Sequence, residues 1–141
     1  MTDGRRRSPR VRPAGEAVVL DASAVLALLR EEAGASRVAD LLPAAAISSV
    51  NLAEVLVVLD RYGVPPADAR RAVDALALDI IPADGATAHA AAGVAAASRH
   101  RGLSLGDCFC LATAHLAGRP AVTADRTWAT IRTGVKVVVV R

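Results

Sequence analysis

Four acidic residues could do chemistry together, because each lies at the start of a helical segment or directly after a short apolar run. They are Asp21, Glu54, Asp107 and Asp125. Gathered in one place, their carboxylates would repel each other by up to about 4 kcal/mol for a pair 4 Å apart at an effective dielectric of 20. No lysine or histidine lies in these segments to neutralise them. Oxygen ligands of this kind suit a hard dication, so the residue types predict a site for Mg²⁺ or Mn²⁺.

Three of these carboxylates also have a purely structural interpretation. Asp21 would cap the helical segment that follows it, since Asp is a favoured N-cap residue. Asp107 comes three residues after Ser104, which is the spacing of a capping box. Asp125 would shape a turn or cap a short helix. Taken singly, these three residues leave the choice between a structural and a chemical role open.

Glu54 fits a structural interpretation least well. Its segment, VNLAEVLVVLD, carries no other charge between Val50 and Leu59. An ionised group in so apolar a segment is rarely left unpaired. Asn51 precedes Glu54 by three residues, shares its helical face and is therefore predicted to hydrogen-bond it.

Hydrophobic periodicity predicts the elements that would position these residues. Strands are expected over residues 17–21, 45–48, 78–82, 121–124 and 135–140. Helices are expected over residues 22–30, 35–42, 50–62, 66–76, 84–101 and 105–117. This alternation implies βαβ units and hence a three-layer α/β/α fold with a mainly parallel sheet of about five strands. Ligands of such sheets bind outside the carboxyl ends of the strands, which is where all four acids are expected.

Length and composition limit the class of protein. The chain has 141 residues, of which 53% are hydrophobic and 22% charged, so it is long and apolar enough for one folded domain. Only 2% are aromatic, which argues against the base-stacking platforms of RRM or OB domains. The two cysteines, Cys108 and Cys110, are too few for a disulfide framework and suit a reducing cytoplasm.

The positive charge is concentrated at the N-terminus. Residues 1–12 hold five arginines and one aspartate, against a formal net charge of +3 for the whole chain, so the remainder is close to neutral. We expect residues 1–16 to form a flexible basic arm and residues 17–141 to form the domain. The acidic residues Glu16 and Asp21 argue against an export signal. The longest run without a charged residue is too short to span a bilayer, so we expect a cytoplasmic protein with no membrane segment.

Four segments together resemble the PIN-domain nucleases, and most nearly the VapC toxins of bacterial toxin–antitoxin pairs. They are VVLDASAVLALL (18–29), SSVNLAEV (48–55), LSLGDCFCLATA (103–114) and AVTADRTW (121–128). The ending VKVVVVR (135–141) is similar to the last strand of that family. The resemblance covers residues 17–141 in the family's order and spacing.

The resemblance implies a role for each acidic residue. Asp21, Glu54, Asp107 and Asp125 would form the catalytic and metal-binding quartet, which holds Mg²⁺ or Mn²⁺. Three further residues match polar positions beside the quartet: Ser23, Asn51 and Thr123. Arg126, directly after the last acid, would contact a substrate phosphate, although a solvated arginine explains it equally well.

The resemblance also implies an activity and partners. It predicts an endoribonuclease toxin that hydrolyses RNA phosphodiester bonds and inhibits translation. Its cognate VapB-like antitoxin would wrap a groove and block the acidic site. Many members of that family also dimerise, so the resemblance implies a homodimer, and the apolar faces of the segments 22–42 and 50–59 are compatible with such an interface.

Several alternatives compete with this interpretation. A haloacid-dehalogenase-type phosphatase needs a second Asp at position 23, where this chain has Ser. A response-regulator receiver needs an acceptor Asp and a Lys that residues 82–84 and Lys136 match poorly. A nuclease of the same fold that cuts DNA stays open, because attack by water needs no 2′-hydroxyl. A non-catalytic module that binds RNA or an antitoxin also stays open, although a pure binder gains nothing from a repulsive acidic cluster.

Overall fold

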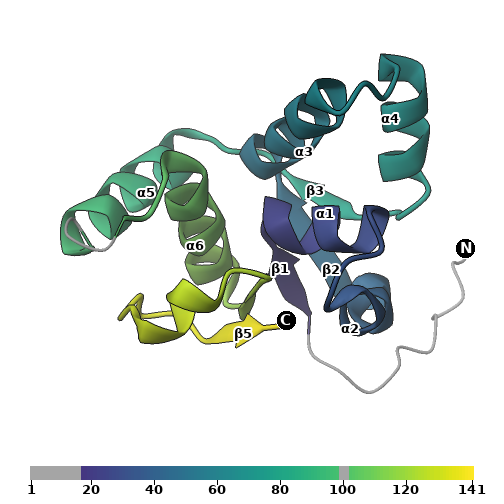
Figure 1. Cartoon of the computed structure of the whole chain (residues 1–141). Helices are drawn as coiled ribbons and strands as arrows, with labels where there is room; N and C mark the ends of the chain where they lie inside the picture. The colour runs from purple at the N-terminus through teal and green to yellow at the C-terminus, as the bar shows by residue number, and fades with distance from the viewer. Residues whose placement is uncertain (1–16, 99–101) are drawn as a thin grey trace, which may run out of the picture.

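A single parallel sheet lies at the centre of the part of the chain that the computed structural model describes, residues 17–98 and 102–141 (Figure 1). Its strands within that part are β1 (Val18–Leu20), β2 (Ala45–Ser48), β3 (Asp79–Ile81), β4 (Ala121–Thr123) and β5 (Val137–Val139). Their order is β3-β2-β1-β4-β5, and every neighbouring pair is parallel. The predicted five-stranded parallel sheet is thus confirmed, whereas the predicted basic arm at residues 1–16 lies outside the described residues.

Six α-helices surround this sheet in the described residues. They are α1 (Ala22–Leu29), α2 (Ala35–Leu41), α3 (Ser49–Arg61), α4 (Pro66–Asp74), α5 (Gly85–Ala97) and α6 (Leu105–Ala117), with short 3-10 helices at Leu42–Ala44 and Arg126–Thr130. Four of the six α-helices have a side chain that accepts a backbone N–H at the N-cap: Asp21, Ser48, Asp84 and Ser104. Such a cap satisfies an N–H group that has no partner inside the helix.

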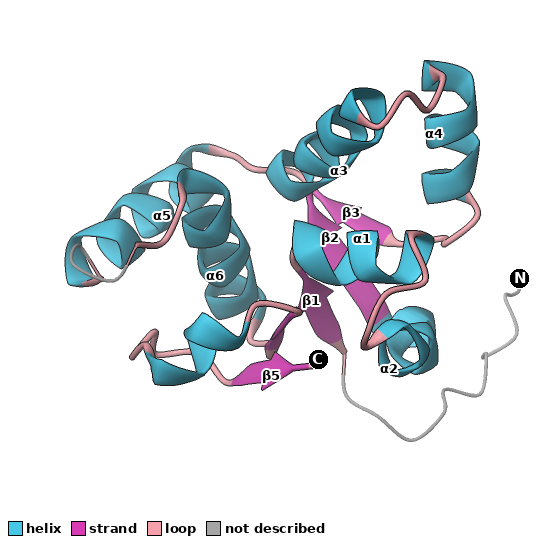
Figure 2. Cartoon of the chain, viewed as in Figure 1, coloured by secondary structure: helices cyan, strands magenta, loops and turns pink. Residues whose placement is uncertain are grey.

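The two faces of the sheet are covered by different helices. In β1, Val18 and Leu20 pack into the core formed with α1 to α4, whereas Val19 between them packs against α6. This alternation is the period of two that a strand buried on both faces must have. Figure 2 shows α5 and α6 on one side of the sheet and α1 to α4 on the other. The three-layer α/β/α architecture is therefore as predicted.

Element boundaries differ from the predictions by a few residues. The hydrophobic run of β5 was expected over 135–140, yet strand pairing covers only Val137–Val139. Helix α4 ends at Asp74, two residues early, because the chain turns over the next three residues and Ala77 adopts a φ of 52°. Helix α5 ends at Ala97, and residues 99–101 of its predicted range lie outside the described part.

The sheet order determines where the site forms. Strand β1 lies in the middle, with β2 on one side and β4 on the other. The chain therefore passes from β1 through β2 to β3 at one edge of the sheet, and from β4 to β5 at the other edge. Side chains that follow β1, β2 and β4 meet at the carboxyl end of the sheet, where the strand order reverses and where ligands of open α/β sheets bind.

Candidate active site

Asp21 is the buried acid of the site. It follows β1, is 3% exposed and caps α1 by accepting the Ala24 N–H at 2.8 Å. Two hydroxyls also donate to its carboxylate: Thr123 Oγ1 lies 2.5 Å from Oδ2, and Ser23 Oγ lies 2.8 Å from Oδ1 and 2.9 Å from Oδ2. Donors from the first turn of α1 and from β4 thus fix the direction of the carboxylate.

Ser23 and Thr123 join the end of β4 to the start of α1. Their hydroxyl oxygens are 3.2 Å apart. Ser23 Oγ accepts the Ala124 N–H at 2.9 Å, and Thr123 Oγ1 accepts the Asp125 N–H at 3.0 Å. Both residues, predicted only as polar neighbours of the quartet, therefore lie between Asp21 and Asp125 and hold the two segments together.

Burial raises the pKa of Asp21 to about 6 because removal from water penalises the charged form. The hydrogen bonds from Thr123, Ala24 and Ser23 oppose this rise, and the charge of Asp107 adds to it. The effect of Asp107 indicates that the two carboxylates lie close enough to repel each other. Without a cation nearby, the Asp21 carboxyl group therefore ionises less readily than an exposed one.

Glu54 lies in α3 and reaches the start of α6. Its Oε1 accepts a hydrogen bond of 2.7 Å from Asn51 Nδ2, as the spacing of the two residues predicted. The same Asn51 amide donates at 3.0 Å to the carbonyl of Gly106 in α6. Glu54 is half-buried, and Asn51 is only 1% exposed. One amide thus ties the Glu54 carboxylate to the helix that carries Asp107.

Asp107 and Asp125 adopt the structural roles that the sequence allowed. Asp107 forms a capping box with Ser104, in which Oδ2 accepts the Ser104 N–H at 2.9 Å and Ser104 Oγ accepts the Asp107 N–H at 3.1 Å. Asp125 Oδ1 accepts from the N–H and the hydroxyl of Thr127, at 2.9 and 2.8 Å. Among the described residues these bonds use one oxygen of each carboxylate, so capping leaves the other oxygen available.

The four acids share one region at the carboxyl end of the sheet. The pKa of Asp107 is raised, chiefly by burial, against hydrogen bonds from Ser104 and with a contribution from the charge of Asp125. The pKa of buried Cys110 lies well above its ordinary value, chiefly because of burial and additionally because of three carboxylates: Asp21, Asp107 and Glu54. Within the described residues, the ion pairs of the structure include none of the four acids. Their charge is therefore not compensated by that part of the protein.

This donor set fits a hard dication. Among the residues that the structure describes, no group of three or more His, Cys, Asp or Glu side chains is close enough to form a ready-made metal cage. Mg²⁺ needs no such cage, because it keeps several waters and is usually held by one or two carboxylates. Uncompensated carboxylate oxygens at one edge of the sheet are the ligands that this ion prefers.

Two further residues bear on the site: Arg126, which the sequence predicted, and Gly106, which it did not. Arg126 is exposed at the start of the short 3-10 helix Arg126–Thr130, and its phosphate contact stays a prediction. Gly106 was missed. It is buried in the first turn of α6, and a Cβ there would lie 2.5 Å from Glu54 Oε1 and closer still to Oε2. A glycine inside a helix directly before an acid was the available signal, since Gly weakens helices.

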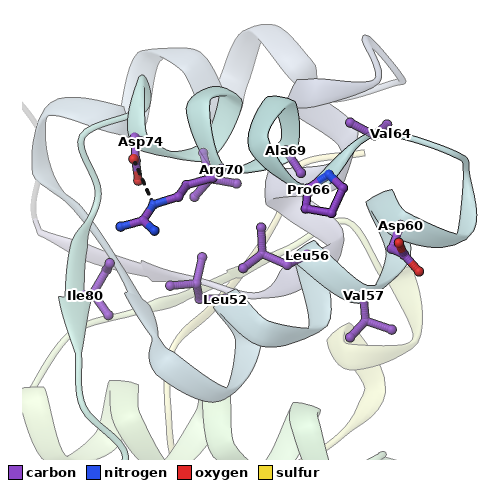
Figure 3. Close-up of a pocket in the computed structure, with 11 residues that line it drawn as sticks. Leu52, Leu56, Val57, Asp60, Val64, Pro66, Ala69, Arg70, Asp74 and Ile80 are labelled. Atoms are coloured by element: carbon purple, nitrogen blue, oxygen red, sulfur yellow. Dashed lines mark ion pairs between the residues drawn. The ribbon is translucent and has the colours of Figure 1, made fainter.

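A hollow of about 600 Å³ lies between α3, α4 and β3 (Figure 3). Leu52, Leu56 and Val57 enter it from α3, and Ile80 from the outer strand β3. The Arg70–Asp74 ion pair of 3.7 Å lies on its rim. Val57 and Ile80 are 49% and 48% exposed, so this α3–α4 groove presents apolar surface to solvent.

The described residues contain no helix that is both long and apolar enough to cross a membrane.

The fold and the site together define an α/β protein with an acidic centre at the carboxyl edge of a five-stranded parallel sheet in its described part. The PIN domain model matches residues 18–133, so the chain belongs to the PIN domain family. The resemblance seen in the four sequence segments is confirmed at the level of the family. A search of curated proteins finds no match.

Solved structures with the same fold include toxin–antitoxin proteins. A toxin–antitoxin complex from Klebsiella pneumoniae is 24% identical, over 89% of this chain and 98% of that one, with a TM-score of 0.66. VapBC2 from Rickettsia felis, bound to a DNA fragment from its promoter, is 17% identical, over 85% and 96%, with a TM-score of 0.67. VapC20 from Mycobacterium tuberculosis, a Sarcin-Ricin loop cleaving toxin, is 19% identical, over 85% and 99%, with a TM-score of 0.64. At these identities the likeness shows the shared fold.

Proposed function

We propose that this PIN-domain protein is a metal-dependent endoribonuclease and the toxin of a VapBC-type toxin–antitoxin pair. The observation that carries the proposal is the gathering of Asp21, Glu54, Asp107 and Asp125 at one edge of the sheet, with no compensating ion pair in the described residues. A repulsive cluster of this kind is of use to a protein that binds a dication. The similarity to VapC20, which cleaves an RNA loop, favours RNA as the substrate.

The quartet would hold Mg²⁺ or Mn²⁺, and the bound ion would supply a reactive water and stabilise negative charge on the phosphate. The chain's own residues orient the ligands. Ser23 and Thr123 direct the Asp21 carboxylate, and Asn51 directs that of Glu54. Arg126, exposed next to the last acid, would bind a neighbouring phosphate of the substrate. The net reaction adds water across a P–O bond of the RNA backbone.

The test is cleavage of total RNA by purified protein with Mg²⁺ or Mn²⁺, against EDTA. Asp21→Asn should lose cleavage by a factor of 100 or more, on the order of what loss of a key electrostatic group costs an enzyme. Asp79→Asn is the matched control, because Asp79 is an exposed carboxylate outside the site. Metal-dependent cutting that persists in Asp21→Asn would contradict the assignment and indicate a contaminating nuclease.

The choice of RNA over DNA needs a separate measurement. A carboxylate site that activates water does not need a 2′-hydroxyl on the substrate. Single-stranded RNA, single-stranded DNA and duplex DNA of the same sequence should therefore be compared under the same metal. Cleavage of RNA alone supports the proposal, whereas preferential cleavage of DNA would overturn the substrate assignment and leave the nuclease assignment standing. Binding of RNA without any cutting would favour the non-catalytic alternative.

We propose that the antitoxin places an apolar segment in the α3–α4 groove. The proposal is supported by the apolar lining of the groove, by Val57 and Ile80 at about half exposure, and by the antitoxin complexes among the similar structures. Val57→Lys should weaken binding of the cognate antitoxin, because a charge would enter the groove. Ala92→Lys, on the exposed face of α5, is the control. Equal binding of the antitoxin by both variants would exclude the groove.

The homodimer stays a prediction. The apolar faces that are compatible with a dimer interface are largely in the core, where Val25, Val38, Val55 and Leu59 are buried. Less apolar surface is thus left for a dimer than the sequence suggested. The molar mass of the purified protein, measured by light scattering, will decide between monomer and dimer.

We propose a cytoplasmic site of action. Cellular RNA is the proposed substrate, and its hydrolysis there would inhibit translation. The two cysteines are free and buried, in keeping with a reducing compartment.

A further inference from the structure

Gly106 lies where the Glu54 carboxylate leaves no space for a side chain. This glycine is buried in the first turn of α6 and faces α3. A Cβ built on it would lie 2.5 Å from Glu54 Oε1 and closer still to Cδ and Oε2, far inside van der Waals contact. Gly93, also in a helix, has nothing within 4 Å of the same atom. The absent side chain at position 106 is therefore a specific accommodation of the Glu54 carboxylate.

Asn51 holds the carboxylate in that room. Its Nδ2 donates to Glu54 Oε1 at 2.7 Å and to the Gly106 carbonyl at 3.0 Å. The opposite orientation of the amide would point Oδ1 at two acceptors, so these two bonds fix which way the side chain lies. The alignment leaves Asn51 Oδ1 buried with no hydrogen-bond partner in the described residues. A buried oxygen without a partner is unfavourable, but the two bonds of Nδ2 fix the direction of the amide.

We propose that Gly106 and Asn51 are positioning residues that seat the Glu54 carboxylate beside Asp107. The Glu54 seat consists of Asn51, Glu54 and Gly106, and it joins α3 to α6 one residue before the next acid of the quartet. The packing and hydrogen bonds of the seat stand on their own, while its role in metal binding rests on the proposed function. A side chain at position 106 would move the flexible Glu54 out of the seat and leave the fold intact.

Mn²⁺ titration into the full chain tests the seat without an activity assay. Gly106→Ala should weaken Mn²⁺ binding by about 10- to 100-fold, as loss of residues that orient metal ligands does, and RNA cleavage should fall in parallel. Gly93→Ala should leave both unchanged, because its Cβ enters open space. Asn51→Leu, similar in size but without the donor, should weaken Mn²⁺ binding like Gly106→Ala. Wild-type affinity in Gly106→Ala would overturn the proposal.

Melting temperatures in EDTA test the seat independently of metal and RNA. In the Glu54→Ala background, Gly106→Ala should raise Tm, because alanine is the better helix former and meets no carboxylate. In the wild-type background the same substitution should raise Tm less or lower it, since it displaces Glu54 from Asn51. Equal Tm shifts in the two backgrounds would overturn the seat. A wild type that neither binds Mn²⁺ nor cuts RNA would instead refute the proposed function, and the Tm comparison would still decide the seat.

Discussion

Asp21 makes stability depend on pH in the opposite sense from most carboxylates. Burial raises its pKa from 3.8 to about 6 in the folded protein. The folded state therefore binds this proton more tightly than the unfolded state does. Its contribution to stability is most favourable below pH 4, declines as the pH rises from about 4 to 6, and is a penalty of about 3 kcal/mol above that window.

Asp21→Asn should therefore stabilise the metal-free protein, and more so at high pH. The neutral amide keeps an acceptor for the Ala24 N–H and carries no charge to bury. We expect the gain in unfolding free energy to be larger at pH 8 than at pH 4.5 by about 2 kcal/mol. Urea unfolding in EDTA at both pH values measures it, with Asp79→Asn as the exposed control. A gain that is the same at both pH values would show that ionisation of Asp21 is not its cause.

The sequence predicted those features of the site that depend on neighbours along the chain. The Asn51–Glu54 bond follows from a spacing of three on one helix, and the Ser104–Asp107 box from the same spacing at a helix start. The room at Gly106 could not be foreseen, because it depends on how α3 packs against α6. The hydroxyl of Thr123 meets Asp21 for a similar reason, since the sheet pairs β1 with β4 across 102 positions of sequence.

At the level of elements, three of the four proposed metal ligands also cap helices. Asp21, Asp107 and Asp125 each accept a backbone N–H at a helix start. A capping carboxylate is held by the local backbone, so its position is set before any ion binds. Structural and chemical interpretations, which compete when the sequence is read alone, are thus compatible.

Ser104→Ala tests how far the capping box supports α6. The substitution removes the oxygen that accepts the Asp107 N–H at 3.1 Å. We expect a loss of about 1 kcal/mol in the free energy of unfolding, as for other N-cap serines. Urea unfolding measures it, and Ser104→Thr, which keeps a hydroxyl, should lie close to wild type. An unchanged midpoint in Ser104→Ala would indicate that packing alone holds the start of this helix.

Helix α6 was predicted with its observed bounds because both of its ends carry chemical signals. Ser104 caps its start, and Gly118 adopts the left-handed conformation at its end, with a φ of 66°. Helix α4 has no such signal at its end, because the residue that adopts a positive φ is Ala77, and alanine ordinarily continues a helix. Strand β2 was predicted with its observed bounds, whereas the other four strands of the described residues were predicted one to three residues too long, because the patterns that predicted them continue past the residues that pair.

At the scale of the whole molecule, the site joins all three layers. Asp21 follows the central strand β1, Glu54 comes from α3 on one face of the sheet, and Asp107 comes from α6 on the other. Separation of the layers would therefore separate the acids. A dication bound among them would in turn oppose that separation, and its effect should appear in global unfolding.

Mg²⁺ or Mn²⁺ should raise the Tm of the wild type at pH 7.5, because an ion that binds only the folded state stabilises it. At a free concentration of 100 times Kd the gain is about 2.7 kcal/mol. Salt also screens repulsion among carboxylates, so KCl at matched ionic strength is the necessary control. Asp21→Asn and Glu54→Gln should each start from an equal or higher Tm in EDTA and gain less from the metal. If KCl reproduces the whole shift, or if both variants gain as much as the wild type, the ion does not bind at the quartet and the acids only repel one another.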